Sequence, residues 1–139
     1  PQHYANLDPR MASSILIYSA ENYVWLPERR ALMALAHEFG HACQLEQWPE
    51  NEPRIYDAWE HAMQHGLYRN VKDENGEVLE QRYAAVNQLE YFAELSMVYF
   101  VGGYYTPFSR EELKSYDALG YEMVRKMWNI DDAQPTQSD

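Results

Sequence analysis

Two histidines four residues apart carry the first indication of chemistry, in the stretch His37-Glu38-Phe39-Gly40-His41. The surrounding run is apolar and free of proline, which predicts a helix. Residues four apart lie on the same face of a helix, so His37 and His41 can present two imidazole nitrogens to one zinc ion. Glu38 then lies beside the open coordination position. The pattern predicts a zinc metallopeptidase.

A catalytic zinc needs three protein ligands and a water, and Glu90 is our candidate for the third ligand. Glu90 and Glu94 share one face of an apolar predicted helix. Two stacked carboxylates are unfavourable there unless something positive lies near them. The spacing alone leaves open that Glu94 is the ligand instead, or that neither glutamate is.

The remaining steps of peptide hydrolysis need a base and a hydrogen-bond donor. We expect Glu38 to take the proton from the zinc-activated water and pass it to the leaving amine. Tyr83, upstream of Glu90, is placed to donate to the oxyanion, although a core tyrosine is the alternative among twelve tyrosines. Glu94 can accept a hydrogen bond from the outer ring nitrogen of a ligand histidine and fix its tautomer.

Other candidate side chains have simpler interpretations. His61 and His65 are again four apart, but no cysteine or carboxylate cluster nearby completes a metal site. We expect them to be partly exposed residues of a helix over Ile55–Tyr68. Cys43 is the one cysteine, which excludes an internal disulfide and leaves the compartment open. We expect it to be a small buried hydrophobe.

The first half of the chain is expected to place the motif between two layers. Ser14–Tyr18 is short, β-branched and predicted to be a strand. Its Ile15–Tyr18 part is either an edge that pairs with an extended peptide substrate or an ordinary core strand. A helix is predicted from Pro27 to about Leu45. Its apolar stripe consists of Leu32, Leu35, Phe39 and Ala42 with Cys43.

The second half is predicted to be mainly helical. We expect a hairpin or an exposed excursion over Asn70–Glu80 and a third helix from Tyr83 to about Phe100. An aromatic loop, Tyr104–Phe108, follows and can help to shape a pocket. Two short helices then begin after Ser109 and Asp117, and the last one ends near Trp128. The expected fold is a single α+β domain over residues 1–130, with a disordered tail over 131–139.

Composition excludes some classes of partner. The chain has 139 residues, with 11 basic and 22 acidic side chains and a net charge of −11. Phosphate binding needs clustered Lys and Arg, so a nucleic-acid partner is not expected. No apolar run is long enough to span a membrane. A peptide or protein substrate is the expected partner.

The motifs together resemble those of a known family. The matching segments are His37–His41, Tyr83-Ala84, Asn87–Glu94, Pro107-Phe108 and Trp128. They resemble the gluzincin catalytic domain of anthrax lethal factor and its lethal-factor-like relatives, and more distantly the Pro-Pro endopeptidases. The resemblance covers roughly residues 14–128.

The resemblance implies a zincin-like fold, with a small N-terminal β-sheet over the motif helix. It implies that His37, His41 and Glu90 bind one zinc ion. It also implies that Glu38 is the general base and that Tyr83, seven residues before Glu90, steadies the transition state.

For Glu94 the resemblance implies the orienting role rather than that of a ligand. It slightly favours a secreted protein, although the sequence does not establish the compartment. The resemblance covers only the catalytic domain of lethal factor and not its large substrate-recruiting domains, so no substrate preference is implied. Two alternatives remain beside a general peptidase: a toxin or effector protease with one protein target, and a non-catalytic zinc-binding module.

Overall fold

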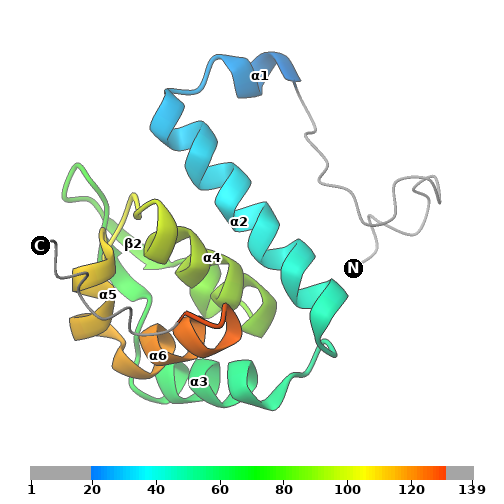
Figure 1. Cartoon of the computed structure of the whole chain (residues 1–139). Coiled ribbons are helices and arrows are strands. Elements are labelled where there is room, and N and C mark those ends of the chain that lie inside the picture. The colour runs from blue at the N-terminus through cyan, green and yellow to red at the C-terminus, as the bar shows by residue number, and fades with distance from the viewer. Residues whose placement is uncertain (1–19, 131–139) are drawn as a thin grey trace, which may run out of the picture.

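The computed structural model describes residues 20–130, which form a mostly helical α+β arrangement (Figure 1). The elements in chain order are α1 (Ala20–Val24), α2 (Glu28–Gln47), α3 (Pro53–Gln64), β1 (Arg69–Lys72), β2 (Val78–Gln81), the 3-10 turn η2 (Tyr83–Ala85), α4 (Gln88–Phe100), α5 (Arg110–Tyr116) and α6 (Ala118–Met127). The expected α+β class is confirmed at this level. The predicted strand Ser14–Tyr18, the N-terminal sheet and the tail lie outside the described residues.

Helix α4 forms the centre of the described structure. Every residue from 91 to 99 is buried, because α2, α3, α5 and α6 all contact this helix. Figure 1 shows α4 between α2 and the pair formed by α5 and α6. An α-helix buried on all sides is normally apolar throughout. The carboxylate of Glu94, which is only 2% exposed, therefore needs partners inside the protein.

Helices α2 and α4 approach each other closely at Gly40. A Cβ atom added at Gly40 would lie only 2.7 Å from the Cα atom of Ala93. The two backbones can touch there because neither helix places a large side chain between them. This crossing brings the histidine-bearing side of α2 directly onto α4.

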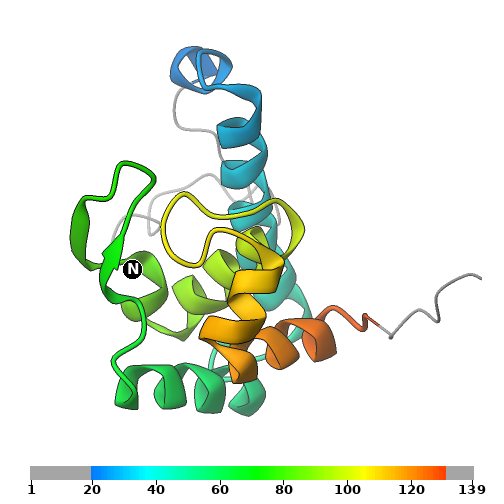
Figure 2. The same ribbon diagram turned by 90° about the vertical axis from the view of Figure 1, so that its left-hand side faces the viewer.

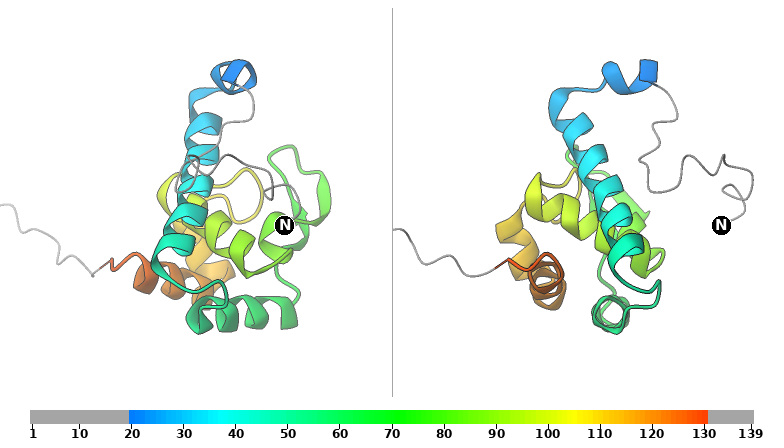
Figure 3. Two further views of the ribbon diagram at one scale, coloured as in Figure 1. Left: turned by 90° about the vertical axis from the view of Figure 1, so that its right-hand side faces the viewer. Right: turned by 45° about the vertical axis from the view of Figure 1, so that its right-hand side comes forward.

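The predicted apolar stripe of α2 is not buried against the other described helices. Leu32 is 49% exposed and Phe39 is 53% exposed. Leu35, Ala42 and Cys43 are only half-buried. Figure 3 shows α2 at one edge of the described helices, with α4 on its inner side. The side that packs on α4 is the one with the small residue, Gly40, and the partners for the α4 carboxylates.

The β1–β2 hairpin and the loop after α4 lie side by side, as Figure 2 shows. Val71 pairs with Leu79 in antiparallel register, and Gly76 in the turn has a φ of +81°. The predicted hairpin is therefore confirmed. The loop is joined to it by an isolated bridge between Asp73 and Tyr105.

Two predicted helix boundaries are wrong. Helix α3 ends at Gln64 rather than Tyr68, because Gly66 and Tyr68 have positive φ angles of +68° and +63°. The third predicted helix begins at Gln88 rather than Tyr83. Its first predicted turn is the separate element η2.

The last two helices begin as predicted. The Ser109 side chain caps α5 by accepting a hydrogen bond from the Glu112 amide. Asp117 caps α6 by accepting from the Gly120 amide, and its other carboxylate oxygen accepts from two buried hydroxyls, those of Tyr68 and Tyr91. This buried carboxylate joins α6 to α4. No helix between residues 20 and 130 is both long and apolar enough to cross a membrane.

Candidate metal centre

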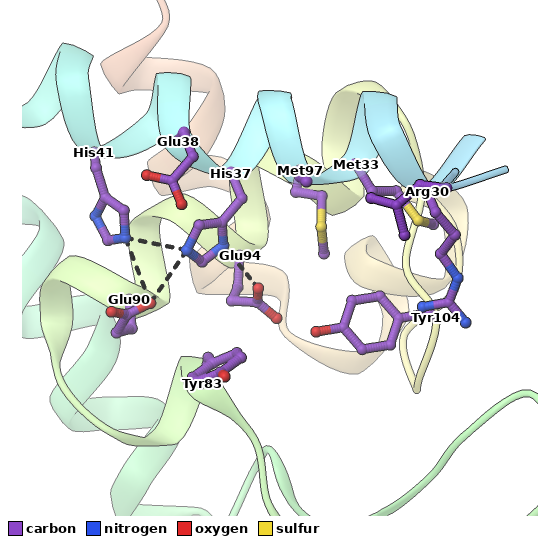
Figure 4. Close-up of a pocket in the computed structure, with 12 residues that line it drawn as sticks. Arg30, Met33, His37, Glu38, His41, Tyr83, Glu90, Glu94, Met97 and Tyr104 are labelled. Carbon is purple, nitrogen blue, oxygen red and sulfur yellow. Dashed lines mark hydrogen bonds and ion pairs between the residues drawn. The ribbon is translucent and has the colours of Figure 1, made fainter. Parts of the chain in front are cut away.

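Three possible ligand atoms form a nearly equilateral triangle between α2 and α4 (Figure 4). The Nε2 atoms of His37 and His41 are 3.1 Å apart. The Oε2 atom of Glu90 lies 3.2 Å from His37 Nε2 and 3.4 Å from His41 Nε2. Tetrahedral zinc, with ligand bonds of about 2.0–2.1 Å, places its ligand atoms about 3.3 Å apart. The three side chains thus have a spacing that one zinc ion can accept.

Each of these side chains is placed by the helix that carries it. His37 and His41 are one turn apart on α2, at the level of the close crossing with α4. Glu90 lies in the first turn of α4, which is capped by the side chain of Asn87 through a hydrogen bond of 2.8 Å from the Glu90 amide. Within the described residues, this is the group of His, Cys, Asp and Glu side chains that converges closely enough for a metal.

The positive charge of a protonated His37 and the negative charge of Glu90 stabilise each other. Burial of the His37 ring alone would lower its pKa, but the hydrogen bonds to Glu90 and Glu94 outweigh burial and raise the pKa to about 9. Hydrogen bonds from His37 and His41 lower the pKa of Glu90 to about 2. In the metal-free protein His37 therefore holds a proton at neutral pH beside an ionised Glu90. A metal cation can replace that proton.

Glu94 lies behind His37 rather than in the triangle. Its Oε1 atom is 2.8 Å from His37 Nδ1, so the other ring nitrogen is turned toward Glu90. The hydroxyl of buried Tyr105 donates a hydrogen bond to Glu94 Oε2. Sequence analysis did not identify Tyr105 as a partner of Glu94. The sequence indicated only that a carboxylate buried in an apolar helix needs more than one hydrogen-bond donor.

A cleft of about 470 Å³ runs along α2 past the triangle. Its lining includes all six side chains for which the sequence predicted a role: His37, Glu38, His41, Tyr83, Glu90 and Glu94. Glu38 is exposed to the cleft. Tyr83 faces α2 from η2, with its ring centroid 6.3 Å from that of His37. The structure therefore brings the six residues together, and their catalytic roles stay predictions.

The cleft continues beyond the residues that sequence analysis selected. Arg30, Met33 and Met97 line this continuation, together with Tyr104 from the aromatic loop that was expected to shape a pocket. The two methionines and Arg30 carried no signal in the sequence, because a methionine or arginine on a helix face is usually structural. The candidate substrate edge at Ile15–Tyr18 lies outside the described residues.

The second histidine pair does not form a comparable group. The rings of His61 and His65 are 4.0 Å apart, and His65 Nδ1 lies 2.8 Å from the backbone oxygen of His61. No third ligand converges on them in the part of the chain that the structure describes. His61 is half-buried and His65 is exposed, in agreement with the interpretation as partly exposed helix residues.

Comparison of the chain with protein-family models, with curated proteins and with solved structures finds no match. The resemblance to the lethal-factor-like gluzincins therefore rests on the sequence motifs alone. The geometry of the cleft is an independent observation.

Proposed function

We propose that the protein is a zinc-dependent metalloendopeptidase with a lethal-factor-like gluzincin site. The observation that carries this proposal is the triangle of His37, His41 and Glu90, whose edges of 3.1, 3.2 and 3.4 Å match the ligand spacing of one zinc ion. The proposal includes a zincin-like fold, in which an N-terminal sheet covers the outer side of α2. The half-exposed Leu32 and Phe39 on that side are consistent with such a cover.

In this proposal each of the six residues predicted from the sequence has a role, and His37, His41 and Glu90 are the ligands. Bound zinc supplies a Lewis acid that polarises the scissile carbonyl and makes water nucleophilic near neutral pH. Glu38 takes the proton of the attacking water and delivers it to the leaving amine. Tyr83, across the cleft from α2, donates a hydrogen bond to the oxyanion that develops on the carbonyl. Glu94 keeps His37 in the tautomer whose Nε2 faces the metal.

Replacing Glu38 with Gln tests the catalytic part of the proposal. The variant keeps the three ligands, so it should bind one zinc ion per chain and lose peptide hydrolysis. Zinc content is measured by elemental analysis, and hydrolysis with a quenched fluorescent peptide library. Glu60→Gln, at an exposed position of α3, is the matched control and should keep both properties. Unchanged cleavage by Glu38→Gln would exclude Glu38 as the base.

The same measurements separate the alternatives. A chain that binds zinc but cleaves neither peptides nor proteins would be a zinc-binding module. A protease that cleaves one protein and ignores the library would be a single-target effector. A zinc content near zero that added zinc does not restore would exclude the whole proposal.

A further inference from the structure

Tyr104 projects into the cleft at some distance from the triangle. It comes from the loop after α4 and lines the same cleft as His37 and Glu38. Figure 4 shows its hydroxyl directed into the cleft, toward the side on which Glu94 lies. The guanidinium of Arg30 lies over the Tyr104 ring, farther from the triangle. Tyr83 instead lies across from the triangle, so the two tyrosines reach different parts of the cleft.

The position of the Tyr104 ring is fixed by two arginines. Arg82 Nη2 donates a hydrogen bond of 2.8 Å to the Tyr104 hydroxyl oxygen. The guanidinium carbon of Arg30 lies 4.6 Å from the ring centroid, and that of Arg82 lies 5.1 Å from it. Arg30 is itself held by Glu74 of the hairpin turn at 2.8 Å. A loop side chain held by this many contacts is preorganised, which lowers the entropy cost of ligand binding.

The hydroxyl of Tyr104 has an unused donor. Its oxygen already accepts from Arg82, and its proton has no acceptor among residues 20–130. Burial and the nearby Glu94 carboxylate raise the pKa of Tyr104, so the phenol stays protonated at neutral pH. Met33 and Met97 line the cleft beside it, and an apolar wall strengthens a hydrogen bond made there.

We propose that Tyr104, positioned by Arg82, binds a backbone carbonyl oxygen of the peptide substrate on the Arg30 side of the scissile bond. This inference rests on the proposed peptidase function. A peptide in the cleft presents unpaired carbonyl oxygens along its whole length, and the free phenol proton is a matching donor. Because Tyr104 lies away from the triangle, its hydrogen bond is the same in the ground state and in the transition state. Such uniform binding lowers KM and leaves kcat unchanged.

Tyr104→Phe removes the hydroxyl and keeps the ring. A single net hydrogen bond corresponds to roughly a threefold to tenfold change in binding, so KM should rise by that factor while kcat stays within about twofold. Tyr83→Phe should show the opposite split, with a lower kcat. Tyr56→Phe, on the partly exposed face of α3, is the matched control and should change neither constant.

A binding measurement without turnover gives a second readout. In zinc-loaded Glu38→Gln protein, the Kd of a fluorescent peptide derived from a cleaved sequence should rise by the same factor when Tyr104→Phe is added. Peptides shortened one residue at a time on each side of the scissile bond locate the carbonyl. The effect of Tyr104→Phe should vanish when the residue that contributes this carbonyl is removed.

Arg82→Lys tests the positioning role. It should raise KM in the parent protein and have no further effect on KM in the Tyr104→Phe background, because interacting side chains give non-additive effects. Normal zinc content and turnover with unchanged KM and Kd in Tyr104→Phe would overturn this inference alone. A parent chain that binds no zinc and cleaves no peptide would overturn the proposed function and this inference with it.

Discussion

Glu90 and Glu94 are chemically identical side chains, four residues apart on α4, that meet different environments. Glu90 is partly exposed and faces two histidine Nε2 atoms. Glu94 is 2% exposed and contacts the back of His37 and the hydroxyl of Tyr105. The environment therefore separates a candidate ligand from a residue that orients a ligand. Sequence spacing alone did not separate them, because both residues lie on the same face of the helix.

Alanine substitutions of these glutamates should have unequal effects on zinc affinity. Glu90→Ala removes a predicted ligand and should abolish tight zinc binding. Glu94→Ala leaves the three ligands and should weaken affinity by about 10–100-fold. Competition with a chromophoric chelator measures both constants, and Glu60→Ala serves as a control. The reverse order would mean that Glu94 is the ligand.

Zinc binding should also release a proton. In the metal-free protein the pKa of His37 is raised from 6.5 to about 9, so its proton is bound below about pH 9. Zinc requires the neutral ring, so the apparent zinc affinity should increase as the pH rises from about 6.5 toward 9. Glu90, whose pKa is lowered to about 2, is already ionised and contributes no proton in this range.

Calorimetry in two buffers of different ionisation enthalpy measures the number of protons released at pH 7. The expected number is about one from His37. An affinity that does not change between pH 6.5 and 8 would contradict this assignment of the proton.

At the scale of single elements, the starts of α5 and α6 and the hairpin were predictable because each depends on local chemistry. Asn75-Gly76 specifies a tight turn between Val71 and Leu79, and Ser109 is a typical N-cap. The inner side of α2 was not predictable from its leucines. Gly40 determines which side of α2 packs on α4, because it permits the close crossing of the two helices. The sequence pattern of one helix does not reveal a contact with a segment far away in the chain.

The start of α4 shows how one element controls the candidate site. Asn87 was predicted to lie inside a helix, but its extended backbone and side chain make it the N-cap of α4. Glu90 is the third residue of that helix. In a capping box a glutamate at this position would hydrogen-bond back to the cap residue, whereas Glu90 is turned toward the histidines. Asn87 therefore holds the first turn without help from Glu90.

Asn87→Ala should reduce both stability and zinc affinity. Loss of an N-cap costs about 1 kcal/mol in the free energy of unfolding. Fraying of the first turn also displaces Glu90, so zinc affinity should fall by about 10-fold, as expected for a residue that supports a ligand. Asn87→Ser, which restores a cap, should recover most of both losses.

Ser109→Ala provides the matched control, because it removes the N-cap of α5, a helix that carries no residue of the cleft. It should lower the free energy of unfolding by a similar amount and leave zinc affinity unchanged. Equal losses of zinc affinity in Asn87→Ala and Ser109→Ala would show that the effect comes from general destabilisation. Urea unfolding and chelator competition provide the two measurements.

At the scale of the whole molecule, the candidate site joins parts of the chain that are far apart in sequence. His37 and His41 come from α2, and Glu90 comes from α4, with α3 and the hairpin between them in the chain. On its outer side α2 presents the half-exposed Leu32 and Phe39, so its contact with α4 is its main attachment to the described structure. A metal ion at the triangle would reinforce this same contact.

Zinc should therefore raise the thermal stability of the whole described fold. A ligand that binds only the folded state at a thousand times its Kd adds about 4 kcal/mol, which corresponds to a rise in Tm of roughly 10 °C for a domain of this size. Removal of zinc with a chelator should reverse the shift, as measured by circular dichroism.

His41→Ala should eliminate the shift because it removes a ligand from α2. His65→Ala, at an exposed position of the other histidine pair, should retain it. An equal zinc-dependent shift in His41→Ala would show that the stabilising metal does not depend on the triangle of His37, His41 and Glu90.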